Sequence, residues 1–154
     1  MNWQRKATAL VAAVLMFTGI TLLVPSTASA TTGNCVNGAN GFANIPDNLS
    51  GTDVEDVPTR SGHWLYLNFG TVNGVRRGWA QLFEGHFEPL SRNVSVWLDW
   101  SRDGGRTWIQ CGPFYNGSGK SSITSAAQRT SSAAGWVFRA GAMDNGEMAL
   151  SRWH

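Results

Sequence analysis

The hydrophobic positions of this chain follow two different patterns. One continuous apolar run extends from Leu10 to Val24, interrupted only by Thr18, Gly19 and Thr21. After residue 50 the apolar stretches are short, Gly, Asn and Asp separate them, and none keeps a 3.6-residue period. Short apolar stretches between turn-forming residues are typical of strands. We therefore predict an all-β domain, a small antiparallel β-sandwich or barrel-like fold built from hairpins.

The clearest hairpin joins residues 63–72 to 75–83 through Asn73-Gly74, a pair that readily takes the positive φ angles of a type I′ turn. With a two-residue turn, the numbers of facing residues sum to 147, as 73 and 74 do. We expect one face of this hairpin to join the core, with the pairs Leu65 and Leu82, Leu67 and Ala80, and Phe69 and Gly78.

The opposite face of the same hairpin is aromatic as well. Trp64 faces Phe83, Asn68 faces Trp79, and Tyr66 faces Gln81. A sheet with two apolar faces is either covered on both sides or presents rings to something outside. Burial is the favoured interpretation, because Trp and Phe dominate small β cores. The alternative is a ligand-binding platform made of Trp64, Tyr66, Trp79 and Phe83.

Two further hairpins are indicated by their turn residues. One joins 94–100 to 107–112, and the other joins 135–143 to 148–153. The segment 36–50 is expected to form turns, and 116–132 to form a loop with one edge strand around Ile123.

A turn at Asn145-Gly146 in the last hairpin sets Phe138 opposite Trp153 and Arg139 opposite Arg152. Like charges directly across a ladder are destabilising. We expect an internal carboxylate, Asp99 or Glu147, to neutralise the two arginines, and a bound anion is the alternative.

The amino-terminal apolar run has the organisation of a helical signal peptide. Arg5 and Lys6 precede it, and the small residues Ala28-Ser29-Ala30 follow it. At a rise of about 1.5 Å per residue the run is too short for a bilayer core of about 30 Å, which disfavours a retained anchor. We predict cleavage after Ala30, with residues 1–30 as signal peptide and 31–154 as a secreted, extracellular β domain.

Cleavage would also change the charge of the chain. Of the twelve Lys and Arg residues, Arg5 and Lys6 lie in the signal, which leaves ten against the ten Asp and Glu. A neutral domain has no general attraction to phosphate backbones or anionic lipid. We therefore expect no nucleic acid and, after cleavage, no membrane as a partner.

The two cysteines of the chain, Cys35 and Cys111, both lie after the cleavage point. In an oxidising compartment such a pair normally forms a disulfide. Neither has a Cys or His at ligand spacing, so we expect no metal site, and we expect no cofactor.

The loop 101–108 reads SRDGGRTW and matches the pattern S-x-D-x-G-x-T-W. It resembles the Asp-box, a hairpin brace repeated in sialidases and related propellers. The resemblance implies a structural role for Ser101, Asp103, Gly105, Thr107 and Trp108, with Trp108 packed beneath the loop. It does not imply sialidase activity, because a propeller needs at least four blades of roughly 40 residues.

On a longer scale, the string from Val96 to Trp108, with Cys111 and the segment 136–140, resembles small secreted actinobacterial proteins of unassigned function that carry a single such hairpin. That resemblance implies secretion and a compact β domain. It implies no substrate.

Candidate catalytic groups are few. Glu84 with Glu88, or Asp99 with Asp103, are conceivable carboxylate pairs of a glycosidase, and the internal histidines are His63 and His86. The chain has no nucleophile-elbow or zinc-protease motif, and we assign no catalytic residue.

The function favoured by these features is a non-catalytic secreted binding module whose aromatic platform stacks on the sugar rings of an extracellular or cell-wall polysaccharide. One alternative is a small secreted hydrolase that uses Glu84, Glu88 or Asp99 with a histidine. Another is a protein-interaction or inhibitor domain that binds a second secreted protein.

Overall fold

The computed structural model describes residues 31–85 and 89–154. The predicted signal peptide, residues 1–30, lies outside the described residues, and so do His86 and Glu88. In chain order the described elements are the short 3-10 segments η1 (Thr32–Asn34) and η2 (Val36–Gly41) and the strands β1 (Phe42–Ala43), β2 (Thr52–Pro58), β3 (Trp64–Val72), β4 (Val75–Phe83), β5 (Ser95–Ser101), β6 (Ile109–Tyr115), β7 (Ser122–Thr124), β8 (Ala127–Arg129), β9 (Val137–Asp144) and β10 (Glu147–Leu150).

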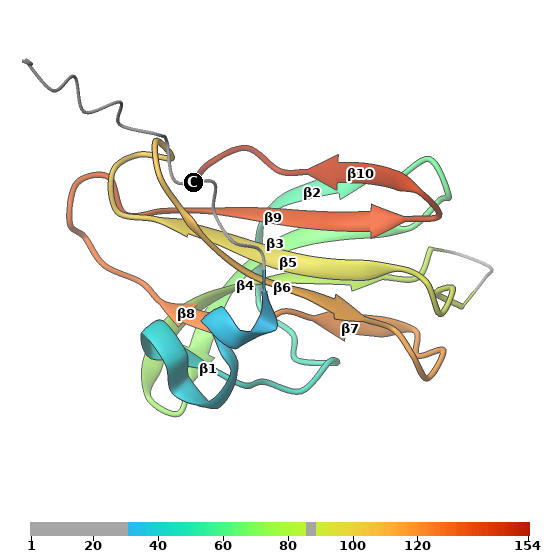
Figure 1. The fold of residues 1–154 in the computed structure, drawn as a ribbon, viewed down its shortest axis with the longest axis horizontal. Coiled ribbons are helices and arrows are strands. Elements are labelled where there is room, and N and C mark those ends of the chain that lie inside the picture. Colours follow the sequence, from blue (N-terminus) through green and yellow to red (C-terminus); the bar gives the residue numbers. More distant parts are fainter. Residues whose placement is uncertain (1–30, 86–88) are drawn as a thin grey trace, which may run out of the picture.

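These strands form two antiparallel sheets that are layered face to face (Figure 1). The larger sheet has the order β1-β8-β4-β3-β2, with β7 also paired to β4, and the smaller has the order β10-β9-β5-β6. The core between them combines Leu65, Leu67 and Leu82 of the larger sheet with Val96, Leu98 and Phe138 of the smaller one. The predicted all-β sandwich is therefore confirmed.

The first hairpin has the predicted turn and register. Asn73 and Gly74 take φ angles of 50° and 77°, and β3 pairs with β4 so that Leu65 faces Leu82 and Trp64 faces Phe83. Positive φ at both central residues is what a type I′ turn requires, and Asn-Gly supplies it with little strain.

The other two hairpins are also present, with one correction. β5 pairs with β6, and β9 pairs with β10 around Asn145-Gly146 in the predicted register as far as Leu150. Beyond that point Phe138 exchanges both backbone hydrogen bonds with His154, so the prediction that it faces Trp153 was wrong by one residue. The ladder slips where the tail turns to meet Glu55, which accepts hydrogen bonds from Arg152 and His154.

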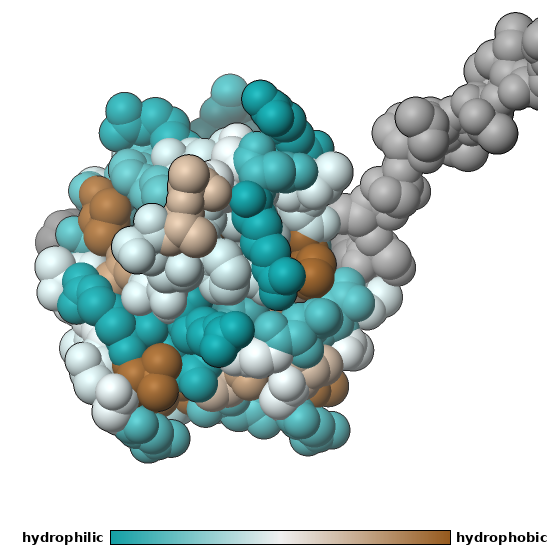
Figure 2. Space-filling model, turned by 90° about the vertical axis from the view of Figure 1, so that its left-hand side faces the viewer, coloured by the Kyte–Doolittle hydropathy of each residue, from teal (hydrophilic) through white to brown (hydrophobic). Residues whose placement is uncertain are grey.

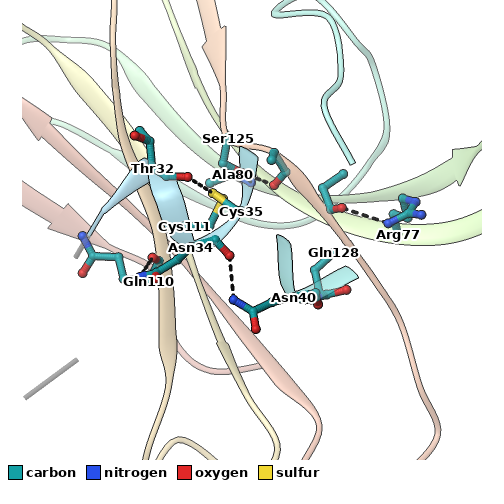
Figure 3. The surroundings of a disulfide bond; sticks show 12 residues. Thr32, Asn34, Cys35, Asn40, Arg77, Ala80, Gln110, Cys111, Ser125 and Gln128 are labelled. Atoms are coloured by element: carbon teal, nitrogen blue, oxygen red, sulfur yellow. Dashed lines mark hydrogen bonds between the residues drawn. A yellow bond between two sulfur atoms is a disulfide. The ribbon is translucent and has the colours of Figure 1, made fainter. Parts of the chain in front are cut away.

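The predicted disulfide ties the start of the described chain to the smaller sheet. Cys35 bonds to Cys111 of β6 across a Cα–Cα distance of 5.4 Å, and both residues are fully buried (Figure 3). A ladder of amides continues from it: Asn34 donates to the carbonyl of Gln110, and Asn40 donates to the carbonyl of Asn34. Gln128 of β8 donates to the Asn40 carbonyl, so the segment around η2 is held against both sheets.

The larger sheet contains strands that lie outside the predicted hairpins. β2 forms one edge of the sheet, and β7 and β8 both pair with β4. Of these, only β7, the strand around Ile123, was predicted. The loop 45–51 crosses the outer face of this sheet. Asp47 anchors it by accepting hydrogen bonds from the Thr124 amide (3.0 Å) and from the Lys120 ammonium group (2.6 Å).

On the outer face of each sheet a tryptophan lies flat over glycine backbone. A Cβ at Gly51 or at Gly70 would come within 2.7 or 2.8 Å of the Trp79 ring. A Cβ at Gly141 would come within 2.1 Å of the Trp97 ring. Each indole therefore occupies space that only glycine leaves open.

The two layers are connected at both ends of the sandwich. At one end His63 Nδ1 and Asp144 Oδ2 lie 2.9 Å apart, and Thr59 donates a short hydrogen bond to the same carboxylate. At the other end the Trp136 indole donates to the Arg129 carbonyl (3.2 Å) and packs on Trp100, with ring centroids 4.8 Å apart.

Candidate functional site

The outer face of the larger sheet arranges its side chains in rows across β2, β3 and β4. Residues that face each other across neighbouring strands share a row. The first row consists of Pro58, Trp64 and Phe83. The second is Asp56, Tyr66 and Gln81, and the third is Asp53, Asn68 and Trp79. Neighbouring strands lie about 4.8 Å apart, so the three rings of the first two rows are close neighbours.

Burial divides the four predicted platform residues. Phe83 is 42% exposed, and Trp64 and Tyr66 are half-buried. Trp79 is only 1% exposed, so its part in the predicted platform was wrong and it follows the favoured interpretation of burial instead. The reason is the loop 45–51, whose Gly51 backbone lies on the indole.

The covering loop ends at the second row. Gln81 donates to the Asp47 carbonyl and to the Ser122 hydroxyl, and Asn68 in turn donates to Gln81. This amide chain closes the sheet on the side of Trp79. The uncovered part is therefore the strip of Pro58, Trp64, Phe83 and Tyr66.

Two carboxylates of β2 border this strip. Burial, and then the nearby charge of Asp56, raise the pKa of Asp53. Burial, and then the charges of Asp53 and Asp56, raise the pKa of Tyr66 further above its ordinary value of 10.0. A phenol is protonated at neutral pH and can donate a hydrogen bond. The strip thus offers apolar ring faces with a phenol donor and carboxylate acceptors at one side, a pattern that suits a polyhydroxylated ligand.

The carboxylates were missed at the level of sequence because β2 was not predicted. Its residues TDVEDVP are rich in types that strands avoid, and a register shift between Asp53 and Glu55 breaks the period-2 alternation. The available signal was Pro58 with several charges, which is a common composition for an edge strand.

The Asp-box-like loop between β5 and β6 is a closed structural brace. Asp103 accepts hydrogen bonds from the Ser101 hydroxyl (2.8 Å) and from the Thr107 amide (2.9 Å) and hydroxyl (2.7 Å). These bonds lower the pKa of Asp103 to about 2, the Thr107 amide contributing most. The indole against Gly105 belongs to Trp153, and Trp108 packs on that ring, so a second tryptophan that the motif does not include supports the loop.

Asp99 neutralises one arginine of the predicted like-charged pair. Arg139 donates to Asp99 Oδ2 through Nε (2.9 Å) and Nη2 (2.7 Å), whereas Arg152 binds Glu55. Glu147, the other carboxylate proposed for this role, binds Arg60 instead. Burial raises the pKa of Asp99, and Arg139 opposes this shift. Asp99 is 1% exposed, so it does not face a substrate in the solvent.

The remaining catalytic candidates do not come together in the described residues. His63 is 5% exposed and is bound to Asp144, a pairing that sequence patterns did not reveal. Glu84 follows β4 and is half-buried, while Glu88 and His86 lie outside the described part of the chain. In residues 31–85 and 89–154, no three His, Cys, Asp or Glu side chains are placed to hold a metal ion.

No helix within the described residues is long and apolar enough to cross a membrane. No protein-family model, curated protein or solved structure matches this chain.

Proposed function

We propose that this chain is exported and acts as a non-catalytic module that binds an extracellular or cell-wall glycan on the uncovered strip of the larger sheet. The observation that carries the proposal is the row of Pro58, Trp64 and Phe83 with Tyr66 beside it. One face of the sheet holds these rings side by side, and the apolar C–H faces of sugar rings pack well on aromatic faces.

Polar groups at the border of the strip support a sugar over a purely apolar ligand. A Tyr hydroxyl such as that of Tyr66 can donate, and the carboxylates of Asp53 and Asp56 can accept, so both kinds of partner that a sugar hydroxyl needs are present beside the strip. The Cys35–Cys111 disulfide is consistent with an oxidising, extracellular location.

The test is retention of residues 31–154 on insoluble cellulose, chitin, xylan and peptidoglycan. We expect the unchanged protein to be retained on at least one of them. The double variant Trp64→Ala and Phe83→Ala should lose retention by about tenfold or more, because two stacking surfaces worth about 1 kcal/mol each are removed.

The matched control places the same kind of change on the other sheet. Tyr115 and Met148 are 66% and 63% exposed, and they lie in one row of the smaller sheet with Ser95 and Met143. Tyr115→Ala with Met148→Ala should keep full retention. Loss in this control, or no retention of the unchanged protein on any polymer, would contradict the proposal.

A further inference from the structure

Five arginines gather at one end of the sandwich. Arg76 and Arg77 follow the Asn73-Gly74 turn, Arg102 and Arg106 belong to the loop between β5 and β6, and Arg129 ends β8. Figure 2 looks onto this end of the molecule, and hydrophilic side chains cover much of it while apolar residues stand apart from one another.

Contacts between neighbours hold this basic end together. Arg77 and Arg129 are direct cross-strand partners in β4 and β8. The Arg129 carbonyl accepts the Trp136 indole N–H, and the Arg102 guanidinium lies 5.4 Å from the centre of the same indole and 4.6 Å from that of Trp100. The charges are therefore carried by a rigid frame of strands and stacked rings.

In the described part of the chain, the arginines of this end form no ion pair with a carboxylate. Arg60, Arg139 and Arg152, elsewhere in the molecule, each bind a carboxylate. Asp103 lies between Arg102 and Arg106 in the same loop, where Ser101 and Thr107 hold its ionised carboxylate. It offsets one of the five positive charges, and the end keeps a net positive charge.

Arg77 has a buried guanidinium nitrogen that no protein group binds in the described part of the chain. Its Nη1 donates to the carbonyls of Gly41 and Ala127, each at 3.0 Å, while its Nε is buried with no partner among the described residues. Its charge also faces Arg129 directly across the ladder. Like charges in this position destabilise a sheet unless an anion lies between or beside them.

A cleft next to Arg102 adds groups suited to a sugar. Its volume is about 300 Å³, and Asn40, Thr107 and Trp108 line it together with Arg102. This volume is at the small end of the range for ligand sites. An amide and a hydroxyl beside a guanidinium match the hydroxyl groups and the negative charge of an acidic sugar unit.

From this arrangement we propose that the basic end binds an acidic polysaccharide, a chain of sugars with carboxylate or sulfate groups. Single-stranded nucleic acid needs free aromatic faces for its bases. Here the rings beneath the arginines are already stacked, Trp136 on Trp100 and both under Arg102. This site is separate from the strip of Pro58, Trp64, Phe83 and Tyr66 and does not depend on it.

The experiment measures binding of residues 31–154 to dextran sulfate and to polygalacturonate, with neutral dextran and a single-stranded oligonucleotide as comparison probes. We expect both acidic polysaccharides to bind, neutral dextran not to bind, and affinity to fall as salt is raised. The triple variant Arg76→Gln, Arg102→Gln and Arg129→Gln should weaken binding by about tenfold or more.

The control variant Arg60→Gln with Arg92→Gln removes two exposed arginines from the opposite end and should change the affinity by about twofold or less. If the triple variant does not fold, Arg76→Gln and Arg106→Gln, both at exposed positions, serve in its place. The proposal is overturned by absence of binding, by equal binding to neutral dextran, by equal loss in the control, or by tighter binding of the oligonucleotide. Loss of retention on neutral glycans in Trp64→Ala with Phe83→Ala, with polyanion binding intact, would separate the two sites.

Discussion

Trp79 shows how one buried side chain decides which part of a sheet is open. Its indole lies against the backbone of Gly70 in β3, and Gly51 of the loop 45–51 covers it. Phe83 lies on the same face of β4, beyond Gln81, and has no such cover. The same outer face is therefore core at one end and surface at the other.

The substitution Trp79→Ala should destabilise the protein strongly. Removal of a fully buried Trp leaves a cavity, and the expected loss in the free energy of unfolding is about 3 to 5 kcal/mol. Urea denaturation followed by circular dichroism measures this loss. Tyr115→Ala, at a residue 66% exposed, is the control and should change stability by about 0.5 kcal/mol or less. A Trp79→Ala protein as stable as the control would show that the indole is not packed as described.

Among the elements, the three hairpins were predictable because their causes are local. Asn73-Gly74 and Asn145-Gly146 set the turns, and the turn sets the register of the strands that follow. The Asp-box-like loop was predictable for the same reason, since its donors and acceptors lie within residues 101–107.

The missed elements depend on contacts between distant residues. β2 is an acidic strand that exists because β3 pairs with it, and β8 is short and pairs with β1 and β4. The loop 45–51 is held by Asp47 bonds to residues 73 and 77 positions away. That loop decides the exposure of Trp79, so the candidate site was predictable only in part. The sequence pattern predicted an aromatic face, but it did not predict which half of that face the loop covers.

The loop between β5 and β6 should make stability depend on acid. The folded state holds the pKa of Asp103 at about 2, below the ordinary value of 3.8, because it favours the ionised carboxylate. The ionised carboxylate therefore stabilises the folded state fully above pH 3.8, and this stabilisation is lost as the pH falls through 2.

The variant Asp103→Asn tests this dependence. It removes the titrating carboxylate and replaces one carboxylate oxygen, so that the amide and hydroxyl of Thr107 and the hydroxyl of Ser101 share a single acceptor oxygen. Near neutral pH the variant should unfold at lower urea concentration than the unchanged protein. The gap between the two should close as the pH falls from 3.8 toward 2. A gap that stays constant over this range would contradict the proposed role of the ionised carboxylate.

At the scale of the whole molecule, the ties that hold the fold together differ in kind. The buried pair of His63 and Asp144 connects one end, Trp136 connects the other, and the disulfide fixes the amino-terminal segment to β6. The first two ties stabilise only the folded state. The disulfide also restricts the unfolded chain, over a separation of 76 residues.

Reduction of the disulfide should lower the free energy of unfolding by about 4 kcal/mol, on the chain-entropy model for a loop of this size. The measurement is urea denaturation with and without reductant. The variant Cys35→Ala with Cys111→Ala should resemble the reduced protein and should not respond to reductant. Equal unfolding midpoints for the oxidised and reduced protein would show that the bridge does not constrain the unfolded chain.

The fit of each flat indole on bare glycine backbone has a consequence for evolution. A side chain at Gly51, Gly70 or Gly141 is tolerated only if the facing ring shrinks at the same time, so these positions should change together with Trp79 and Trp97. Distant relatives of this chain should therefore be recognisable by correlated substitution at these pairs even where overall similarity has decayed.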